Sequence, residues 1–472
     1  MGKNHMSRRE FLQASVAGLS FMYLPGVGRI KAYPFEFAES GDTFGRLCFN
    51  ENPLGPSHLA REAMKQAVDE GHRYPDWFSS TLETKIAEHH NVSPNMICAG
   101  TGATEIIRLV ADAFLYPGDE MVTATPTYSQ MAYEAAANGA TVVHVPVDER
   151  YMIDLSLIKA AITENTKLIS LVNPNNPLAT IFTKHDMRIF MNSLPPGIIV
   201  VVDEAYHHYV HSPYYESCVR YITGGFPVIV IRTFSKAYGL AGVRIGYSVA
   251  SGGHTSMIGS SQNIGMVSRL GQAAAIASLN DSDHVDNTVS LNDHAKEVLM
   301  NGLHALNLEY IPSETNFMMF DTGMSATSVA SQLANRGYQV RVGWGMPRHI
   351  RVSTGTVDEM YGFIYALQEI LGQNSLKDGP PMFGLDRVRP NPFTRECTIQ
   401  ISTLGAERVR LVIYDAAGRM VQSLVNGVMT PGVHDIVWNG RDVRGRNVAS
   451  GVYVVNLMQG EFATSTRVTV IR

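Results

Sequence analysis

Polar residues gather directly after four short apolar runs, and these positions are the ones in the sequence that could do chemistry. The four clusters are residues 100–104, 173–177, 203–206 and 232–236. Each preceding run has the length of a buried β-strand, and the carboxyl ends of parallel strands meet at one edge of a sheet, where ligands bind. We therefore expect a carboxylate, a lysine, amides and hydroxyls to converge on an anionic, polar and roughly planar ligand.

The residue types in these clusters indicate which ligand. Asp203 at a strand end can keep a pyridine nitrogen protonated, and Lys236 can form an imine with an aldehyde if partial burial keeps its amine partly neutral. A phosphate binds backbone amides at a helix start together with hydroxyls and an arginine, which residues 102–104, Ser235 and Arg244 supply. Pyridoxal 5′-phosphate (PLP) asks for all of these groups at once, so it is the expected cofactor.

The segment at residues 235–244, SKAYGLAGVR, resembles the cofactor-lysine motif of fold-type I PLP-dependent aminotransferases. The spacing of Asn176, Asp203, Tyr206, Lys236 and Arg244 is also similar to that family. Three further segments resemble the histidinol-phosphate aminotransferase branch, namely residues 50–56 (NENPLGP), 73–76 (RYPD) and 351–356 (RVSTGT). The resemblance covers residues 45 to about 372, and its motifs are specific when taken together.

The resemblance implies a role for each residue around the cofactor ring. Lys236 would form a Schiff base with the cofactor and would then move a proton between substrate and cofactor. Asp203 would pair with the pyridine nitrogen, while Asn176 and Tyr206 would hydrogen-bond the ring oxygen. Tyr128 would stack on the ring face. Lys236, Asp203 and Tyr206 are thus the expected catalytic residues.

The resemblance also implies contacts to the cofactor phosphate and to the substrate. The phosphate contacts would be Gly102, Ala103, Thr104, Ser235 and Arg244. Tyr74 would reach the phosphate of a neighbouring subunit, which implies a homodimer. Arg351 would grip an anionic group of the substrate, with Arg341 as a second anion contact and Asn52 as a further substrate residue. One departure from the family is Ala179, where a glycine is usual; because alanine tolerates positive φ poorly, we expect a changed turn.

Simpler roles compete with these assignments. Taken singly, Asp203 could cap a helix, Lys236 could lie in solvent, Tyr128 could fill a core, and the arginines could be structural ion-pair partners. The joint occurrence of these residues favours the cofactor site. His207 and His211 have a helical spacing that suggests a metal, but the sequence has no His-Glu-x-x-His motif and no cysteine cluster, so we expect no metal site.

Alternation of short apolar runs with helical stretches predicts an α/β domain with a mostly parallel sheet. The expected strands are residues 96–99, 121–124, 168–172, 198–202 and 228–231, and residues 102–115 form an expected amphipathic helix. We assign residues 33–372 to an aminotransferase domain, whose large domain is residues 71–270 and whose small α/β domain is residues 33–70 and 271–372. After a linker at residues 373–384, period-two alternation at 409–413, 452–457 and 466–471 predicts a β-sandwich over residues 385–472.

Both ends of the chain carry signs of export. Residues 7–12 (SRREFL) and the apolar stretch after them resemble a twin-arginine (Tat) signal peptide, so we assign residues 1–32 to a signal that is cleaved after Ala32. The C-terminal domain resembles Ig-like domains linked to type IX secretion and the flagellar-hook-cap Ig fold, in residues 391–393, 412–419 and 449–453. The Tat and type IX machineries are therefore possible partners, although such domains usually follow a general secretory signal. If the N-terminus is only a basic tail, the expected location is the cytoplasm.

Composition narrows the function classes. The 472 residues are 45% hydrophobic and 17% charged, which indicates a globular protein of several domains. The net charge is −5 and no basic stripe stands out, so nucleic acid is not an expected partner. The four cysteines lie far apart, which gives no zinc motif and leaves one or two disulfides open.

The leading hypothesis is transamination between an amino acid, or an amino phosphate such as histidinol phosphate, and a 2-oxo acid. The first alternative is a PLP-dependent decarboxylase of the threonine-phosphate type, which would use the same Lys236 and Asp203. The second alternative is a surface-displayed binding protein without catalysis.

Overall fold

The structure is a computed structural model that describes residues 45–263, 265, 267–372, 384–403, 408–429, 432–459 and 462–472 of the chain. The expected signal peptide, residues 1–32, and residues 373–383 of the expected linker lie outside the described residues. Within the described ranges, no helix is both long enough and apolar enough to cross a membrane.

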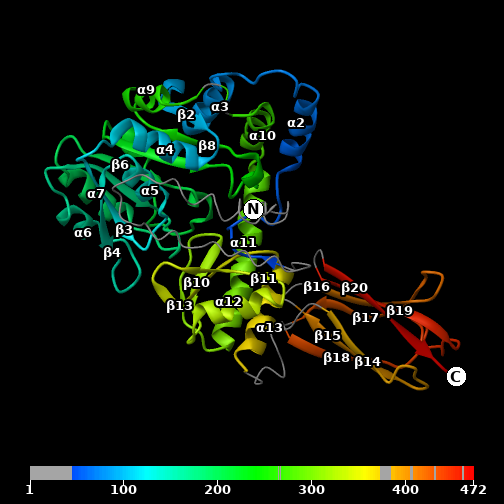
Figure 1. Cartoon of the computed structure of the whole chain (residues 1–472). Helices are drawn as coiled ribbons and strands as arrows, with labels where there is room; N and C mark the ends of the chain where they lie inside the picture. Colours follow the sequence, from blue (N-terminus) through cyan, green and yellow to red (C-terminus); the bar gives the residue numbers. More distant parts are fainter. Residues whose placement is uncertain are drawn as a thin grey trace, which may run out of the picture. The chain divides into compact units, whose positions relative to one another are not determined.

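A seven-stranded sheet forms the centre of the larger part of the chain (Figure 1). Its strands in spatial order are β2 (Ile97–Gly100), β8 (Gly246–Val249), β7 (Val228–Thr233), β6 (Ile199–Asp203), β5 (Thr166–Val172), β3 (Glu120–Thr125) and β4 (Thr141–Pro146). Strand β8 is antiparallel to both of its neighbours, and the pairs from β7 to β4 are parallel. The central strands are continuous apolar runs because both faces of the sheet are covered. The expected mostly parallel sheet and its five strands are confirmed.

Helices cover both faces of this sheet and bury two separate apolar cores. One face holds α4 (Ala103–Phe114), α5 (Gln130–Ala137) and α9 (Gly252–Ser260). The other holds α2 (His58–Val68), α3 (Ser80–His90), α6 (Leu155–Ala160), α7 (Lys184–Ser193), α8 (Val219–Thr223) and α10 (Arg269–Leu279). Helix α4 confirms the expected helix at residues 102–115, since Ile106, Val110 and Phe114 all turn into the core. Ala60 of α2 and Ala274 of α10 belong to the core of the large sheet, although we assigned both helices to the small domain.

A third core forms around a four-stranded antiparallel sheet. This sheet has the order β12 (Arg341–Gly343), β13 (Met346–Ser353), β10 (Phe317–Asp321) and β9 (Tyr310–Ile311). It packs with α11 (Ser282–Ala305), α12 (Ala326–Ala334) and α13 (Val357–Ile370). The first described residues form β1 (Gly45–Arg46), which pairs in parallel with β11 (Tyr338–Gln339) in a separate two-stranded sheet. Leu47, the next residue, belongs to the same core as the four-stranded sheet.

The C-terminal part is a sandwich of two antiparallel sheets, as the alternating sequence predicts. One sheet has the order β14 (Gly384–Arg389), β15 (Cys397–Thr403) and β18 (Gly432–Trp438). The other has the order β17 (Met420–Val428), β16 (Arg408–Tyr414), β19 (Gly451–Gln459) and β20 (Phe462–Val470). Buried Trp438 packs edge-on against Phe393 and Tyr453, each with a ring-centroid distance of 5.4 Å, and joins the two sheets in one core.

All four cysteines are free and buried. Cys48 lies in the N-terminal segment, Cys98 in β2, Cys218 just before α8 and Cys397 in β15. The disulfides that the sequence left open are therefore not formed in this structure.

Candidate active site

The polar clusters singled out from the sequence meet at one edge of the large sheet. Asp203 ends β6 and pairs in register with Val172 at the end of β5 and with Ile231 in β7. Asn176 follows β5, Lys236 follows β7, and two residues separate the end of β2 from the start of α4. Because β5, β6 and β7 run parallel and end at the same level, their following residues share one site.

Lys236 is partly buried and faces the N-terminal segment. Its Nζ donates a hydrogen bond to the backbone oxygen of Phe49 at 2.9 Å and lies 5.6 Å from the centre of the Tyr206 ring. Burial, followed by the nearby Arg351 cation, lowers the pKa of Lys236 to about 8. An appreciable fraction of this amine is therefore neutral near pH 7 and can act as a nucleophile.

Asp203 is a buried carboxylate, and no cation among the described residues lies within ion-pair distance of it. Its Oδ1 accepts a hydrogen bond from the backbone N–H of Ala205 at 3.0 Å. Burial outweighs this bond and the field of Lys236, and raises the pKa of Asp203 to about 6. A buried acid without a partner needs a cation to stay ionised, and a protonated pyridine nitrogen would supply one.

The hydroxyl of Tyr206 connects the N-terminal segment with the loop that follows β5. This oxygen accepts hydrogen bonds from Asn50 Nδ2 at 2.9 Å and from Asn176 Nδ2 at 3.4 Å. Burial raises the pKa of Tyr206 to about 12, so the hydroxyl keeps its proton at neutral pH. It can therefore donate to an acceptor such as a phenolic ring oxygen.

Arg351 is the most enclosed cation of the site, with 3% of its surface exposed. Its Nη1 donates to Asn176 Oδ1 at 2.6 Å and its Nη2 donates to the backbone oxygen of Cys48 at 2.7 Å. The guanidinium also lies over the rings of Phe317 and Trp344, at 5.2 and 5.3 Å from their centres. Burial lowers the pKa of Arg351 to about 10, and its Nε has no hydrogen-bond partner among the described residues. A buried donor of this kind fits an anionic ligand group.

Arg341 is the second cation on this side of the site. Its guanidinium carbon lies 5.8 Å from the centre of the Trp344 ring, so one indole contacts both Arg341 and Arg351. Arg341 contributes to lowering the pKa of Arg351, as expected for two neighbouring positive charges. The two arginines predicted to bind substrate are thus brought together.

The start of α4 forms an anion-binding corner with Arg244. Gly102 has φ 80°, and a Cβ atom at this position would collide with the guanidinium of Arg244. Ala103 and Thr104 form the first turn of α4, where backbone N–H groups have no partner inside the helix. Tyr128 is 37% exposed, and its hydroxyl shares a hydrogen bond with Thr104. Ser235 is buried and lies nine residues before Arg244 in the sequence. Together these residues offer amides, hydroxyls and one cation, which fits a phosphate.

A buried ion pair ties the ends of β6 and β7 together, and sequence reasoning missed it. Arg232 and Glu204 are 4% and 1% exposed, and Arg232 donates to Glu204 Oε2 from Nε at 3.0 Å and from Nη2 at 2.7 Å. Ser217 Oγ and the backbone N–H of Cys218 donate to the same carboxylate, at 2.9 and 2.6 Å. Glu204 follows Asp203 directly, and Arg232 lies four residues before Lys236. The pair therefore fixes the two strand ends that carry the central groups of the site.

Two further predicted site residues are Tyr74 and Asn52. Tyr74 is 78% exposed and contacts Trp77 edge-on at 5.4 Å between ring centres. Asn52 donates to the backbone oxygen of Ala237 and to Thr288 Oγ1, both at 2.9 Å, which occupies its amide in holding the chain. Asn50, two residues earlier in the same motif, contacts Tyr206 instead. Both asparagines of the motif are thus held by protein contacts, and Asn52 also lines the cavity described next.

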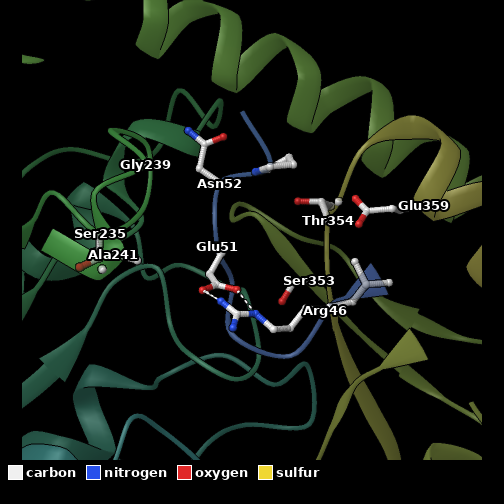
Figure 2. A pocket seen from close by; sticks show the side chains of 13 residues that line it. Arg46, Glu51, Asn52, Ser235, Gly239, Ala241, Ser353, Thr354 and Glu359 are labelled. Carbon is white, nitrogen blue, oxygen red and sulfur yellow. Dashed lines mark hydrogen bonds and ion pairs between the residues drawn. The ribbon is translucent and has the colours of Figure 1, made fainter. Parts of the chain in front are cut away.

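A cavity of about 340 Å³ borders the site at Ser235 (Figure 2). The segment with Glu51 and Asn52 runs between the loop of Ser235 and Gly239 on one side and Thr354 and Glu359 on the other. Arg46 and Glu51, which both line this cavity, form an ion pair. Lys236 and Asp203 do not line this cavity, so it is a space beside the site and not the place of the cofactor ring.

The histidines near the site are occupied by protein contacts. Burial lowers the pKa of His208 to about 3, and that of His207 is also depressed by burial. His211 pairs with Asp293 at 2.8 Å. Across the described parts of the chain, no group of three or more histidine, cysteine or acidic side chains could hold a metal ion.

Comparison with known proteins accounts for this arrangement. Residues 44–367 match the model of the family described as aminotransferase class I and II. The chain belongs to this family. Histidinol-phosphate aminotransferases are among its relatives: that of Moorella thermoacetica is 37% identical over 329 residues, which cover 69% of this chain and 85% of the relative. That of Akkermansia muciniphila is 38% identical over 328 residues, which cover 69% and 90%.

Solved structures agree with the curated relatives. A putative histidinol-phosphate aminotransferase from Erwinia carotovora atroseptica has a TM-score of 0.68 and 31% identity, over 70% of this chain and 96% of that one. The Sinorhizobium meliloti histidinol-phosphate aminotransferase, solved in complex with PLP, has a TM-score of 0.67 and 30% identity, over 70% and 91%. This aminotransferase has the fold-type I architecture and depends on PLP. Residues 394–460 match a separate model, the FlgD Ig-like domain.

Proposed function

We propose that this aminotransferase moves an amino group between an amino compound with an anionic group, such as an amino acid or histidinol phosphate, and a 2-oxo acid. The observation that carries the proposal is the placement of two groups at one edge of the sheet: Lys236, whose pKa is lowered to about 8, and buried Asp203, which has no cation within ion-pair distance among the described residues. A reactive amine and a carboxylate that needs a cation are what an aldehyde-bearing pyridine ring would use.

The residues around this pair have matching roles toward PLP. When bound, PLP supplies a ring that draws electrons from the substrate α-carbon. Lys236 would hold the cofactor aldehyde carbon and later move the proton at the substrate α-carbon, while Asp203 would keep the pyridine nitrogen protonated. Asn176 and Tyr206 would donate to the ring oxygen, and Tyr128 would cover the ring face.

The phosphate of PLP would bind in the corner where α4 begins. Its contacts would be the backbone of Gly102, Ala103 and Thr104, the hydroxyl of Ser235 and the guanidinium of Arg244. Arg244 lies against Gly102 at this point, which supports the assignment. The N-terminal end of a helix favours a dianion through its free amides and its dipole.

Arg351 and Arg341 would bind the anionic group of the substrate. The buried Nε of Arg351, which has no hydrogen-bond partner among the described residues, supports this role. The guanidinium of Arg341 supports it too, because it contacts the same Trp344 ring as Arg351. Two neighbouring cations favour a doubly charged group or two separate anions. Asn52 would act on the substrate only indirectly, by holding the segment that carries Asn50 and Glu51.

We infer that the working form is a homodimer in which Tyr74 contacts the cofactor phosphate of the other subunit. Tyr74, Trp77 and Phe78 are exposed aromatic side chains on one short segment, which is unusual for a surface that stays in water. Light scattering of the purified protein tests the dimer. A Tyr74→Ala variant that stays dimeric and binds PLP as tightly as the parent contradicts the shared site.

We also propose that the protein is exported, with residues 1–32 as a Tat-like signal and the C-terminal Ig-like domain as a sorting or attachment module. The match of residues 394–460 to the FlgD Ig-like model supports the second part. Secretion by the Tat and type IX routes is testable by fractionating cells that express the full chain and a variant with both Arg8 and Arg9 replaced by lysine. Identical fractions for both chains would contradict the Tat route.

The decisive experiment for the reaction is an absorbance titration of the PLP-loaded protein with histidinol phosphate, glutamate and aromatic amino acids. Conversion of the bound cofactor to its amine form by one donor establishes the half-reaction and the substrate class. Release of carbon dioxide instead identifies a decarboxylase. A Lys236→Ala variant that keeps the parent spectrum and activity refutes the role of Lys236.

A further inference from the structure

Two turns of the C-terminal sandwich share one sequence pattern, Asp-x-x-Gly-Arg. The first, at residues 415–419, joins β16 to β17, and the second, at residues 442–446, lies between β18 and β19. In each turn the arginine N–H donates to the aspartate Oδ1 at 2.9 Å, and the arginine Nε donates to Oδ2, at 2.8 Å from Arg419 and 3.0 Å from Arg446. Each turn is therefore held by its own hydrogen bonds and presents its side chains in a fixed arrangement.

The two turns lie at the same end of the sandwich. The backbone N–H of Val443 in the second turn donates to the oxygen of Val421, two residues after the first turn, at 2.9 Å. The end of β20 joins them, because Arg472 Nη2 donates to the backbone oxygen of Gly440 at 2.8 Å and its N–H donates to Ser450 Oγ at 2.8 Å. This end therefore gathers five exposed arginines, Arg419, Arg441, Arg444, Arg446 and Arg472, and we call it the arginine end.

Exposed aliphatic side chains are next to three of these arginines in the sequence. Met420, Val443 and Ile471 are 57%, 60% and 50% exposed, and each is next in sequence to an arginine of this end. Met420 begins β17, Val443 lies in the second turn and Ile471 follows β20. Exposed aliphatic side chains gain nothing from water, and they stabilise a contact only if they enter an apolar layer. Exposed cations with exposed aliphatic neighbours are the combination that a lipid headgroup layer favours.

The C-terminal domain as a whole is also positively charged. Residues 384–472 contain eleven arginines and no lysine against seven acidic residues, while the whole chain has a net charge of −5. Within the two turns, only Asp415 and Asp442 oppose the arginines. Backbone hydrogen bonds in the turns lower the pKa of both aspartates, so they stay ionised, but the five arginines still exceed them. Arginine binds phosphate oxygens through a planar fork, which lysine cannot do.

We propose that the arginine end docks onto an anionic lipid surface, with arginines on the lipid phosphates and Met420, Val443 and Ile471 entering the headgroup layer. A single-stranded nucleic acid is a poorer fit, because no aromatic side chain that the structure describes in this domain is exposed for base stacking. A soluble acidic polysaccharide would bind the arginines but would leave the side chains of Met420, Val443 and Ile471 in water. The inference concerns the C-terminal domain alone and is independent of the proposed reaction.

The test is sedimentation of the full-length, PLP-loaded protein with vesicles of phosphatidylcholine alone and of equal parts phosphatidylcholine and phosphatidylglycerol. We expect binding to the mixed vesicles only, and its loss at high salt. Arg419→Ala and Arg444→Ala should each weaken binding about fivefold, since one arginine near an anionic surface contributes about 1 kcal/mol. Val443→Ser should weaken binding several-fold at unchanged charge.

The matched control is Arg408→Ala, which removes the same charge near the start of β16, six residues before that strand ends at Tyr414. It should leave vesicle binding unchanged, and all variants should keep the parent unfolding temperature and aminotransferase activity. Equal loss with Arg408→Ala, or binding to neutral vesicles, overturns the docking surface. Capture of the chain by alginate but not by the mixed vesicles overturns the choice of lipid.

Discussion

The buried pair of Arg232 and Glu204 gives a prediction whose size can be worked out from its contacts. Replacing Arg232 with methionine keeps most of the side-chain volume but leaves the Glu204 carboxylate, 1% exposed, without a cation. Its remaining donors would be Ser217 Oγ and the backbone N–H of Cys218. Removing one partner of a buried pair costs about 3–5 kcal/mol in the free energy of unfolding, because the other charge stays buried.

The pair should also couple strongly in a double-mutant cycle. Burial opposes the charge of Arg232, but the Glu204 carboxylate outweighs burial and raises the pKa of Arg232, so the guanidinium keeps its charge. We expect Arg232→Met and Glu204→Leu to be far less than additive, since the double variant buries no charge. Urea unfolding followed by circular dichroism measures the free energy of unfolding of all three variants. PLP titration shows whether cofactor affinity falls when the ion pair between the ends of β6 and β7 is removed.

The control is the exposed pair of Arg348 and Asp321, which has the same N–O distance of 2.7 Å but side chains that are 58% and 22% exposed. Arg348→Met should cost less than about 1 kcal/mol, because water screens this pair. If Arg232→Met costs no more than Arg348→Met, burial does not make the Glu204 pair important. If Arg232→Met costs stability but leaves PLP affinity unchanged, the pair does not position the site.

Three further predictions follow from single residues. The raised pKa of Asp203, about 6 against 3.8, means that its charged form opposes folding of the cofactor-free protein above pH 6, by roughly 3 kcal/mol, and that this cost disappears as the pH falls from 6 toward 4. Asp203→Asn should therefore stabilise the cofactor-free protein at pH 8 but not at pH 4, while weakening PLP binding; equal effects at both pH values in urea unfolding would contradict this. Thr356→Ala removes the capping box of α13, in which Glu359 N–H donates to Thr356 Oγ1, and should lower stability by about 1 kcal/mol in the same assay, with no change if the helix end is held elsewhere. A lysine at position 351 cannot reproduce both hydrogen bonds of Arg351, to Asn176 and to the Cys48 oxygen. Arg351→Lys should therefore weaken transition-state binding by about 1.5–3 kcal/mol, so that kcat/KM falls roughly ten- to hundredfold. An unchanged kcat/KM excludes Arg351 from substrate binding.

The sequence predicted the elements and the central residues of the site for a simple physical reason. Strands buried on both faces are continuous apolar runs, and the residues that follow parallel strands must lie at one edge. The sequence therefore predicted that Asn176, Asp203 and Lys236 lie close together in one site. The structure adds Ala179, which takes φ 64° and is held by a hydrogen bond from its N–H to the Asn175 oxygen at 2.7 Å. Alanine thus accepts the left-handed conformation that we expected it to resist.

Other parts of the site have no signature in the sequence. Lys236 and Arg351 are held by the backbone oxygens of Phe49 and Cys48, and every residue type has such an oxygen. The same extended segment turns Asn50 toward Tyr206 and Asn52 toward Thr288. Which asparagine contacts Tyr206 depends on the path of the backbone, where Asn50 has φ 57°.

The four buried thiols divide the molecule into parts whose opening can be followed separately. Cys98 is enclosed in the large sheet, Cys48 in the segment that leads from the small sheet, and Cys397 in the C-terminal sandwich. A thiol reagent reaches each sulfur only when the structure around it opens, so the rate of labelling at each cysteine measures the local free energy of opening. Labelling with and without PLP would separate the elements that the cofactor holds closed from the sandwich, whose Cys397 serves as the internal reference.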